Sequence, residues 1–375
     1  MMQTQTIRSG SQQESPLEIK HNQKLKFGKS SDFQIELRRR VDDLFQSQGL
    51  RERDCPAMYI KTVFLLVSFA TLYGLLVFAA QSWWQSLPLS ILLGLVMAAI
   101  GFNIQHDGGH QAYSNVAWVN KLMSMTLDLI GGSSYNWRWK HMVLHHIYVN
   151  ITSYDTDLDI GIVGRLTPYQ KWLPVHRWQH YYLWLLYGLV TIRWQLYDDF
   201  HNVLIGRIGN HPYPRPTGWD LVIFVGGKAI FLTLAFGIPL LFHPLWLVLA
   251  FYGLTMFVLG LLLSIVFQLA HTVESAKFLI PQPATGQIDS AWAIHQVETT
   301  VNFSRDNWLM TWLLGGLNFQ VEHHLFPKIC HIHYPAVSKV VEQTCQDFGV
   351  SYMQHRSFWG GIASHFRWLR QMGMG

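Results

Sequence analysis

The sequence predicts an all-α integral membrane protein: four transmembrane helices paired as two hairpins, with a cytoplasmic helical cap that holds a histidine-rich dimetal site. Three observations support this fold class. Half of the 375 residues are hydrophobic and only 14% are charged, whereas soluble domains usually carry about 25% charged residues. Two long stretches, residues 62–106 and 229–273, contain no Asp, Glu, Lys or Arg. The chain also has 19 histidines, many of them in tight clusters.

Each charge-free stretch can cross a membrane twice, because one helical crossing takes about 20 apolar residues. We therefore expect a first transmembrane hairpin at residues 57–106 and a second at residues 219–272. The turns are expected near residues 81–88 and 241–244, where proline and tryptophan occur. The tryptophans that would lie at the far membrane interface, as in an aromatic belt, are Trp83, Trp84 and Trp246. Two such hairpins in a soluble core are disfavoured, since soluble helices average only about 12 residues.

The distribution of the 28 Lys and Arg residues orients the hairpins. None of them lies in either predicted far-side turn. By the positive-inside rule, the N-terminal segment 1–56, the central segment 107–218 and the C-terminal segment 273–375 are all cytoplasmic. The net charge of +5 suits a membrane surface or an acidic partner, but it is too small to indicate binding to nucleic acid.

Two shorter elements complete the predicted fold. Residues 32–50 are expected to form a cytoplasmic helix, because apolar side chains recur near helical spacing at Phe33, Leu37, Val41, Leu44 and Phe45. The first 30 residues are polar and lack the apolar core of a signal peptide. Residues 181–192 are apolar but too few to cross the bilayer. We expect them to lie in the membrane interface or to pack beneath the hairpins.

Histidines fall in four groups that this topology brings to the cytoplasmic face. One group ends each hairpin, a third lies in the central segment, and the fourth lies in the C-terminal segment. The candidate metal ligands are His106, His110, His141, His145, His146, His271, His323, His324 and the amide of Gln320. Eight imidazoles are too many for one ion, since zinc normally takes four ligands, and they suit two. Imidazole binds zinc, copper, iron or nickel.

Helical spacing suggests how these ligands are arranged. Three sets are spaced to share one helical face: His106 with His110, His141 with His145, and Gln320 with His323 and His324. His146 would point about 100° away from His145 and could reach a second ion. Asp107, Asp128 and Glu322 could accept the free ring N–H of a ligating histidine. Residues 155–159 resemble the start of a calcium loop but lack its later glycine and acid, so we interpret them as a solvated loop.

The three histidine boxes, 106–110, 141–146 and 320–324, together with two membrane hairpins, resemble the membrane fatty-acid desaturases. Gln320 opens the third box where most desaturases have histidine, which is typical of the front-end group. Residues 56–62, 323–327 and 329–335 are similar to cyanobacterial Δ6 (linoleoyl) acyl-lipid desaturases. The resemblance covers nearly the whole chain.

This resemblance implies a specific chemistry. The eight histidines would hold two Fe ions, with Gln320 at the variable position of the third box. The enzyme would use O2 and two electrons to insert a cis double bond into a polyunsaturated acyl chain carried on a lipid or a thioester. Neither His-Pro pair, at His211 and His243, continues into the Gly-Gly of a fused cytochrome-b5-type domain. An external donor, ferredoxin or cytochrome b5, is therefore expected.

Other functions remain open from the sequence alone. A desaturase or hydroxylase of other regioselectivity, acting on fatty-acyl or sphingolipid chains, would use the same scaffold. A membrane metal transporter or sensor belongs to a different class. Transport would require polar or ionisable residues within the spans, and the two charge-free stretches provide no Asp, Glu, Lys or Arg.

Overall fold

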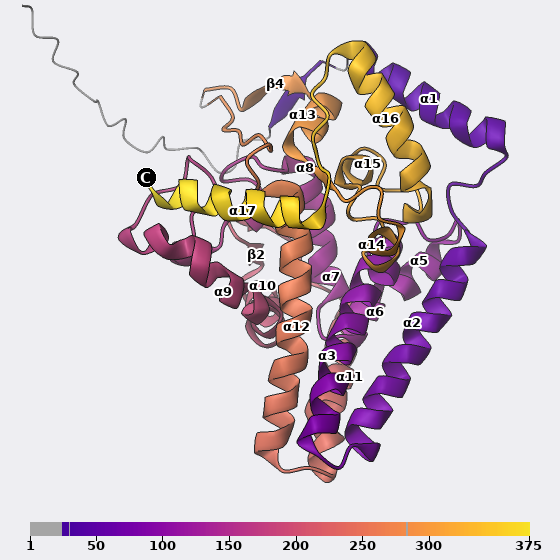
Figure 1. Cartoon of the computed structure of the whole chain (residues 1–375), viewed down its shortest axis with the longest axis vertical. Coiled ribbons are helices and arrows are strands. Elements are labelled where there is room, and N and C mark those ends of the chain that lie inside the picture. Colours follow the sequence, from indigo (N-terminus) through magenta and orange to yellow (C-terminus); the bar gives the residue numbers. More distant parts are fainter. Residues whose placement is uncertain (1–24, 30, 283) are drawn as a thin grey trace, which may run out of the picture.

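The computed structural model describes residues 25–29, 31–282 and 284–375 and is mostly helical. Four long helices form a narrow stem, and the other elements form a wider cap at one end of it (Figure 1). The expectations for residues 1–24 lie outside the described part of the chain. The predicted all-α architecture with four membrane-length helices is confirmed.

The stem consists of two helical hairpins. The first comprises α2 (Pro56–Gly74), the π-helical turn η1 (Leu75–Ala79) and α3 (Trp83–Ile100). The second comprises α11 (Gly218–Leu232), η8 (Thr233–Gly237), η9 (Pro239–Leu241) and α12 (Leu245–His271). The first turn is shorter than expected, because α3 begins at Trp83 and includes Pro88 in its first turns. Pro88 is the sixth residue of the helix, past the N–H groups that lack an intrahelical partner, so it removes one hydrogen bond from the second turn.

Apolar side chains cover the outside of the stem. Ile60, Val63 and Phe64 on α2 are all more than half exposed, as are Val222 and Val225 on α11. Such a surface is unfavourable in water but matches the hydrocarbon of a bilayer. The stem therefore has the dimensions and the surface of a membrane-spanning bundle.

Helix α1 (Asp32–Gln48) confirms the helix expected at residues 32–50. Its buried face consists of Phe33, Leu37, Val41 and Phe45. That face packs on α16 (Tyr334–Phe348), so the two ends of the described chain share one core in the cap. Figure 1 shows the two helices side by side at the edge of the cap.

The rest of the cap is built from short helices and three minimal sheets. The helices that carry or support the histidines are α4 (His106–Gly109), α5 (Ala117–Ser124), α6 (Thr126–Leu129), α7 (Ser134–Trp137), η3 (Arg138–His145), α8 (His146–Tyr148), α13 (Trp292–Thr299), α14 (Trp308–Leu313) and α15 (Gln320–Leu325). The outer helices are α9 (Gln179–Arg193), α10 (Asp199–Ile205) and α17 (Phe358–Gly373). The strands pair as β1 (Lys26–Gly28) with β4 (Gln287–Ala291), β2 (Arg207–Ile208) with β3 (His211–Pro212), and β5 (Asn302–Phe303) with β6 (Gln354–His355).

Helix α9 contains the apolar residues 181–192, which the sequence places either in the interface or beneath the hairpins. It packs along α12, where Gly260 lets the two backbones approach closely, because a Cβ there would lie 2.8 Å from the carbonyl oxygen of Gly188. A side chain at Gly188 would collide with Phe257 of α12. The opposite face of α9 exposes Tyr181 and Leu185. The helix thus packs on the second hairpin and does not add a fifth span.

Candidate metal centre

Both hairpins deliver histidines to the cap end of the stem. At the end of α3 the helix widens into the π-helical turn η2 (Gly101–Gln105) and continues as α4, which begins at His106. His271 is the last residue of α12. A π-helical turn rotates the residues that follow it relative to a regular helix, and such turns recur at functional sites. Here the turn sets the direction of the first histidine box.

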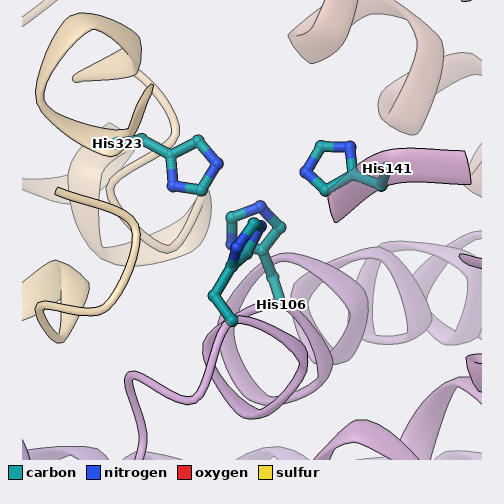
Figure 2. Close-up of side chains that lie close together, drawn as sticks. His106, His141 and His323 are labelled. Atoms are coloured by element: carbon teal, nitrogen blue, oxygen red, sulfur yellow. The ribbon is translucent and has the colours of Figure 1, made fainter. Parts of the chain in front are cut away.

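The second and third histidine boxes lie on elements of the cap, and their side chains approach the histidines of the first box. His141 and His145 lie on η3, itself a π-helical segment, and His146 begins α8. His323 and His324 lie on α15, which is buried throughout. Figure 2 shows the rings of His106, His141 and His323, from three separate segments of the chain, facing a common space.

The first histidine group consists of His106, His110, His141 and His323, whose ring nitrogens lie within 4.8 Å of one another. The ring centroids of His106 and His110 are 4.7 Å apart, and those of His106 and His323 are 4.4 Å apart. Four imidazoles from three elements thus point at one volume that a single ion could occupy.

The second histidine group consists of His145, His271 and His324, again with ring nitrogens within 4.8 Å. His146 lies between the groups. Its Nε2 atom is 3.2 Å from Nε2 of His141 and 2.9 Å from Nε2 of His323, and its ring stacks on His324. The eight histidines predicted from the sequence therefore converge as two adjoining groups.

The pairings expected from helical spacing recur in the structure. His106 and His110 share the first group. His141 and His145 stack with ring centroids 5.3 Å apart and come together beside Asp157, and His323 and His324 come together beside His146. His145 and His324 also belong to the second group, so these two pairs connect the groups.

Hydrogen-bond partners fix the outer nitrogens of three histidines. His145 Nδ1 lies 3.1 Å from Asp155 Oδ2, and His324 Nδ1 lies 2.9 Å from Gln296 Oε1. His323 Nδ1 lies 3.2 Å from the hydroxyl of Tyr334. A hydrogen-bond acceptor at Nδ1 favours the tautomer that carries its proton on Nδ1. The Nε2 atom then faces the histidine group with a free lone pair.

The sequence had suggested other carboxylates for this role, and that expectation was wrong. Asp107 bonds His331 at 2.8 Å, and Asp128 accepts from the backbone N–H of Ser134. The carboxylate of Glu322 accepts hydrogen bonds from Asn302 and Tyr352, and its burial raises its pKa to about 7. Among the described residues, none of the three makes a hydrogen bond to one of the eight histidines.

The loop at residues 155–159 was also misjudged. Asp155 is not solvated: it is buried, and its carboxylate accepts hydrogen bonds from the backbone N–H groups of Asn150 and Asp157 as well as facing His145. Asp155 therefore orients His145 and does not belong to a solvated loop. The alternating acidic residues in the sequence did not distinguish a solvated loop from a buried partner of a histidine.

Several buried nitrogens in the two groups have no hydrogen-bond partner among the described residues. They are His110 Nε2, His145 Nε2, His271 Nδ1 and His324 Nε2. A buried polar atom without a partner is costly unless a ligand satisfies it. Burial, aided by neighbouring imidazoles, also holds the pKa of His110, His141, His146, His323 and His324 well below its usual range. Neutral imidazoles with free lone pairs are the form that binds a metal, so the residues present fit a pair of ions.

Gln320 begins α15 and is buried beside the second group. Its amide nitrogen lies 3.0 Å from Nε2 of His271. This contact is compatible with a hydrogen bond from the amide to the imidazole. The proposed metal-ligand role of Gln320 stays a prediction.

Trp137 forms one wall of the first group. Its ring stacks on His141 with centroids 4.7 Å apart and lies edge-on to His110 at 5.5 Å. It can approach this closely because residue 109 is glycine: a Cβ there would lie 2.2 Å from a carbon of the indole. The two glycines after Asp107 thus serve packing, which the sequence alone did not reveal.

Comparison with known proteins gives a consistent result. Residues 82–356 match the family described as fatty acid desaturase. The chain is 38% identical, over 94% of its length, to the sn-1 linoleoyl-lipid 6-desaturases of Arthrospira platensis and of a Synechocystis strain, covering 95% and 98% of those proteins. It is 35% identical, over 92% of its length, to the acyl-lipid (8-3)-desaturase of Physcomitrium patens, of which it covers 72%.

Proposed function

The chain belongs to the fatty acid desaturase family and is a membrane oxidoreductase, and from that premise we propose that it is a front-end desaturase acting at the Δ6 position of a linoleoyl-type chain on a glycerolipid. Two relatives of nearly equal length are named for that activity. Gln320 at the start of the third box supports membership of the front-end group.

The observation that carries the proposal is the convergence of eight histidines in two adjoining groups, seven of them buried and His141 partly buried. We assign as ligands of two Fe ions His106, His110, His141, His145, His146, His271, His323 and His324, with Gln320 beside His271 as a ninth candidate. When bound, such an iron pair supplies the oxygen-activating chemistry that removes two hydrogens from adjacent methylenes, with two external electrons and two protons completing the reduction of O2 to water.

The protein's own residues have a holding and shielding role in this mechanism. Asp155, Gln296 and Tyr334 orient three of the imidazoles through Nδ1. Trp137 and the stem residues below it exclude water from the first group. A site that holds its ligands rigid and dry keeps an aggressive oxidant from reacting with solvent or with the protein itself.

We further propose that the cap and the two termini face the cytoplasm. The absence of Lys and Arg from both far-side turns supports this orientation. A cytoplasmic metal centre would be accessible to a soluble electron donor. The net positive charge suits an acidic donor such as a ferredoxin, with cytochrome b5 as the second candidate.

The deciding experiment is expression in a host that lacks Δ6 desaturation and is supplied with linoleic acid. We expect a new double bond at carbon 6, located by mass spectrometry of derivatised fatty acids, and about two irons per purified chain. A double bond elsewhere would overturn the regioselectivity alone. A hydroxylated product or a modified sphingolipid would indicate the alternative activities on this scaffold, and an unmodified acyl pool would contradict the proposal.

A further inference from the structure

A cavity of about 640 Å³ lies between the two hairpins, in the half of the stem far from the histidines. Side chains from both hairpins line it. Its volume is typical of sites that enclose an organic ligand, which range over about 300–1,000 Å³. An apolar space of this size inside a bundle is not filled by water, since water needs polar partners on several sides.

The lining becomes more apolar along the stem. At the turn end the cavity meets Gln81, Ser82, Ser86 and His243. At the inner end it meets Met97, Leu129, Phe231 and Met256. The two hydroxyl side chains near Met256, Tyr252 and Thr255, donate their hydrogen bonds to Gln195 and to the carbonyl of Ser90. This polarity matches that of a lipid whose ester region lies at the membrane interface and whose chain points inward.

The mouth of the cavity lies at the level expected for the membrane interface. Trp83 and Trp246 both line it and are 72% and 69% exposed. Exposed tryptophans at a helix end mark the boundary between head groups and hydrocarbon. His243 donates a hydrogen bond to the carbonyl of Val77 at 2.7 Å, which ties the two hairpins together beside the opening.

The depth of the cavity fits one acyl chain. Ser86 and Met97 mark its two ends on α3, and the helical rise between them is about 16 Å. The hydrocarbon of one leaflet is about 15 Å thick, half of a bilayer core of about 30 Å.

The cavity is separate from the metal centre. None of the residues that line it belongs to the two histidine groups. Trp137, which stacks on His141, is packed in the same hydrophobic core as Met97 and Phe231 at the inner end of the cavity. A chain that occupies the cavity therefore does not present a methylene to the metal site.

From these observations we propose that the cavity binds one acyl chain of a membrane glycerolipid from the leaflet far from the histidines. Its glycerol ester region lies beside Gln81 and Ser82, and its methyl end lies beside Phe231. The lipid is a bound component of the stem and not the chain that reacts. This site is independent of the regioselectivity proposed above.

The test uses the full-length protein in nanodiscs of phosphatidylcholine that contain a small fraction of the same lipid with a diazirine at the end of one chain. After illumination we expect cross-links at Met97, Phe231 and Met256. Cross-links confined to outward-facing residues such as Leu92 and Val222 would overturn the proposal. So would loss of the cavity cross-links on adding an excess of the acyl substrate, because the cavity would then belong to the reacting chain.

A matched pair of variants adds a second readout. Ser86→Trp fills the cavity from α3, while Leu87→Trp adds the same side chain on the exposed side of the helix. We expect Ser86→Trp to reduce the cavity cross-links at least fivefold and Leu87→Trp to leave them unchanged. Equal cross-linking in both variants would contradict the site. If Ser86→Trp fails to fold, Ala235→Phe can replace it, because Ala235 lines the cavity from η8. If neither variant folds, the cross-link map of the wild-type protein decides whether the cavity holds the lipid.

Discussion

The Nδ1 atom of His145 lies 3.1 Å from Oδ2 of Asp155, and both side chains are buried. Burial alone would lower the pKa of His145, but the charge and hydrogen bond of Asp155, together with the charge of Asp157, raise that pKa above its ordinary value. The carboxylate is itself held by two backbone N–H groups. It therefore acts as a fixed acceptor that sets the tautomer of His145 and directs Nε2 toward His271 and His324.

We predict that Asp155→Asn weakens iron binding and activity by about 10–100-fold, the usual effect of removing such a carboxylate. The amide keeps the size of the side chain but loses the charge that favours a proton on Nδ1. Iron per chain and product formed in the heterologous host measure the effect. Asp159→Asn, an exposed change in the same loop, is the control and should retain both. Wild-type iron content and activity in Asp155→Asn would show that the pair has only a structural role.

Alanine at His141, His145 or His323 should abolish product formation and remove at least one iron per chain. Each ring contributes a nitrogen to one of the two groups. The checks are metal analysis of the purified variant and gas chromatography of the host's fatty acids. His201→Ala is the control, since His201 lies on α10 and stacks on Tyr197 outside both groups. Desaturation by any of the three box variants would refute the ligand assignment.

The sequence predicted the stem and the eight histidines because both depend on local composition. Charge-free stretches and clustered histidines are visible without knowing any contact. The partners of the histidines were not predictable in this way. Gln296 and Tyr334 reach their histidines only after α13 and α16 pack on α15. Asp155 reaches His145 through the turn that follows α8. None of the three is marked by a distinctive spacing in the sequence.

The π-helical turns were missed for a related reason. The histidine spacing was interpreted with a regular helical period, which η2 and η3 do not follow. Such turns depend on how the helix end packs on its neighbours, so a one-dimensional period does not reveal them. The regular period still predicts which residues converge, and the turns decide how their rings divide between the two groups.

The charge pattern predicted the second hairpin but not the buried position of Lys228 within it. This lysine immediately precedes the charge-free stretch 229–273 and lies within the predicted second hairpin, and in the structure it is a buried residue of α11. Its ammonium group bonds Asp199 Oδ2 at 2.6 Å and the carbonyl of Gly131 at 2.8 Å. Asp199 also accepts from Asn136, the neighbour of Trp137. A lysine within a span is tolerated only when it is paired in this way.

We predict that Lys228→Met destabilises the protein by about 3–5 kcal/mol, because it leaves the carboxylate of Asp199 buried without its partner. Adding Asp199→Asn to that variant should restore part of the loss, since the amide carries no charge. Thermal unfolding in detergent of the wild type, both single variants and the double variant measures the coupling energy between the two residues. Lys121→Met removes an exposed pair with Asp220 and should change stability by less than about 1 kcal/mol. Additive effects of the Lys228 and Asp199 changes would contradict a coupled pair.

Asp128 provides a pH-dependent prediction. Its side chain is buried on α6, one carboxylate oxygen has no partner among the described residues, and burial raises its pKa to about 6. The folded protein thus holds this proton more tightly than the unfolded chain, in which an aspartate titrates near pH 4. Stability from this group is present below about pH 4 and is lost as the pH rises to about 6, at a cost of up to about 3 kcal/mol.

Asp128→Asn removes that titration and keeps an oxygen to accept from the N–H of Ser134. We expect the variant to be more stable than the wild type above pH 6, by several degrees in Tm, and the difference to shrink toward zero near pH 4. Thermal unfolding of the iron-free protein between pH 4 and 8 measures it. Asp306→Asn, at an exposed position, should show no pH-dependent difference. Only a titrating group produces a stability difference that changes with pH. A gain in Tm that stays constant from pH 4 to pH 8 would therefore show that the buried charge of Asp128 does not destabilise the wild type.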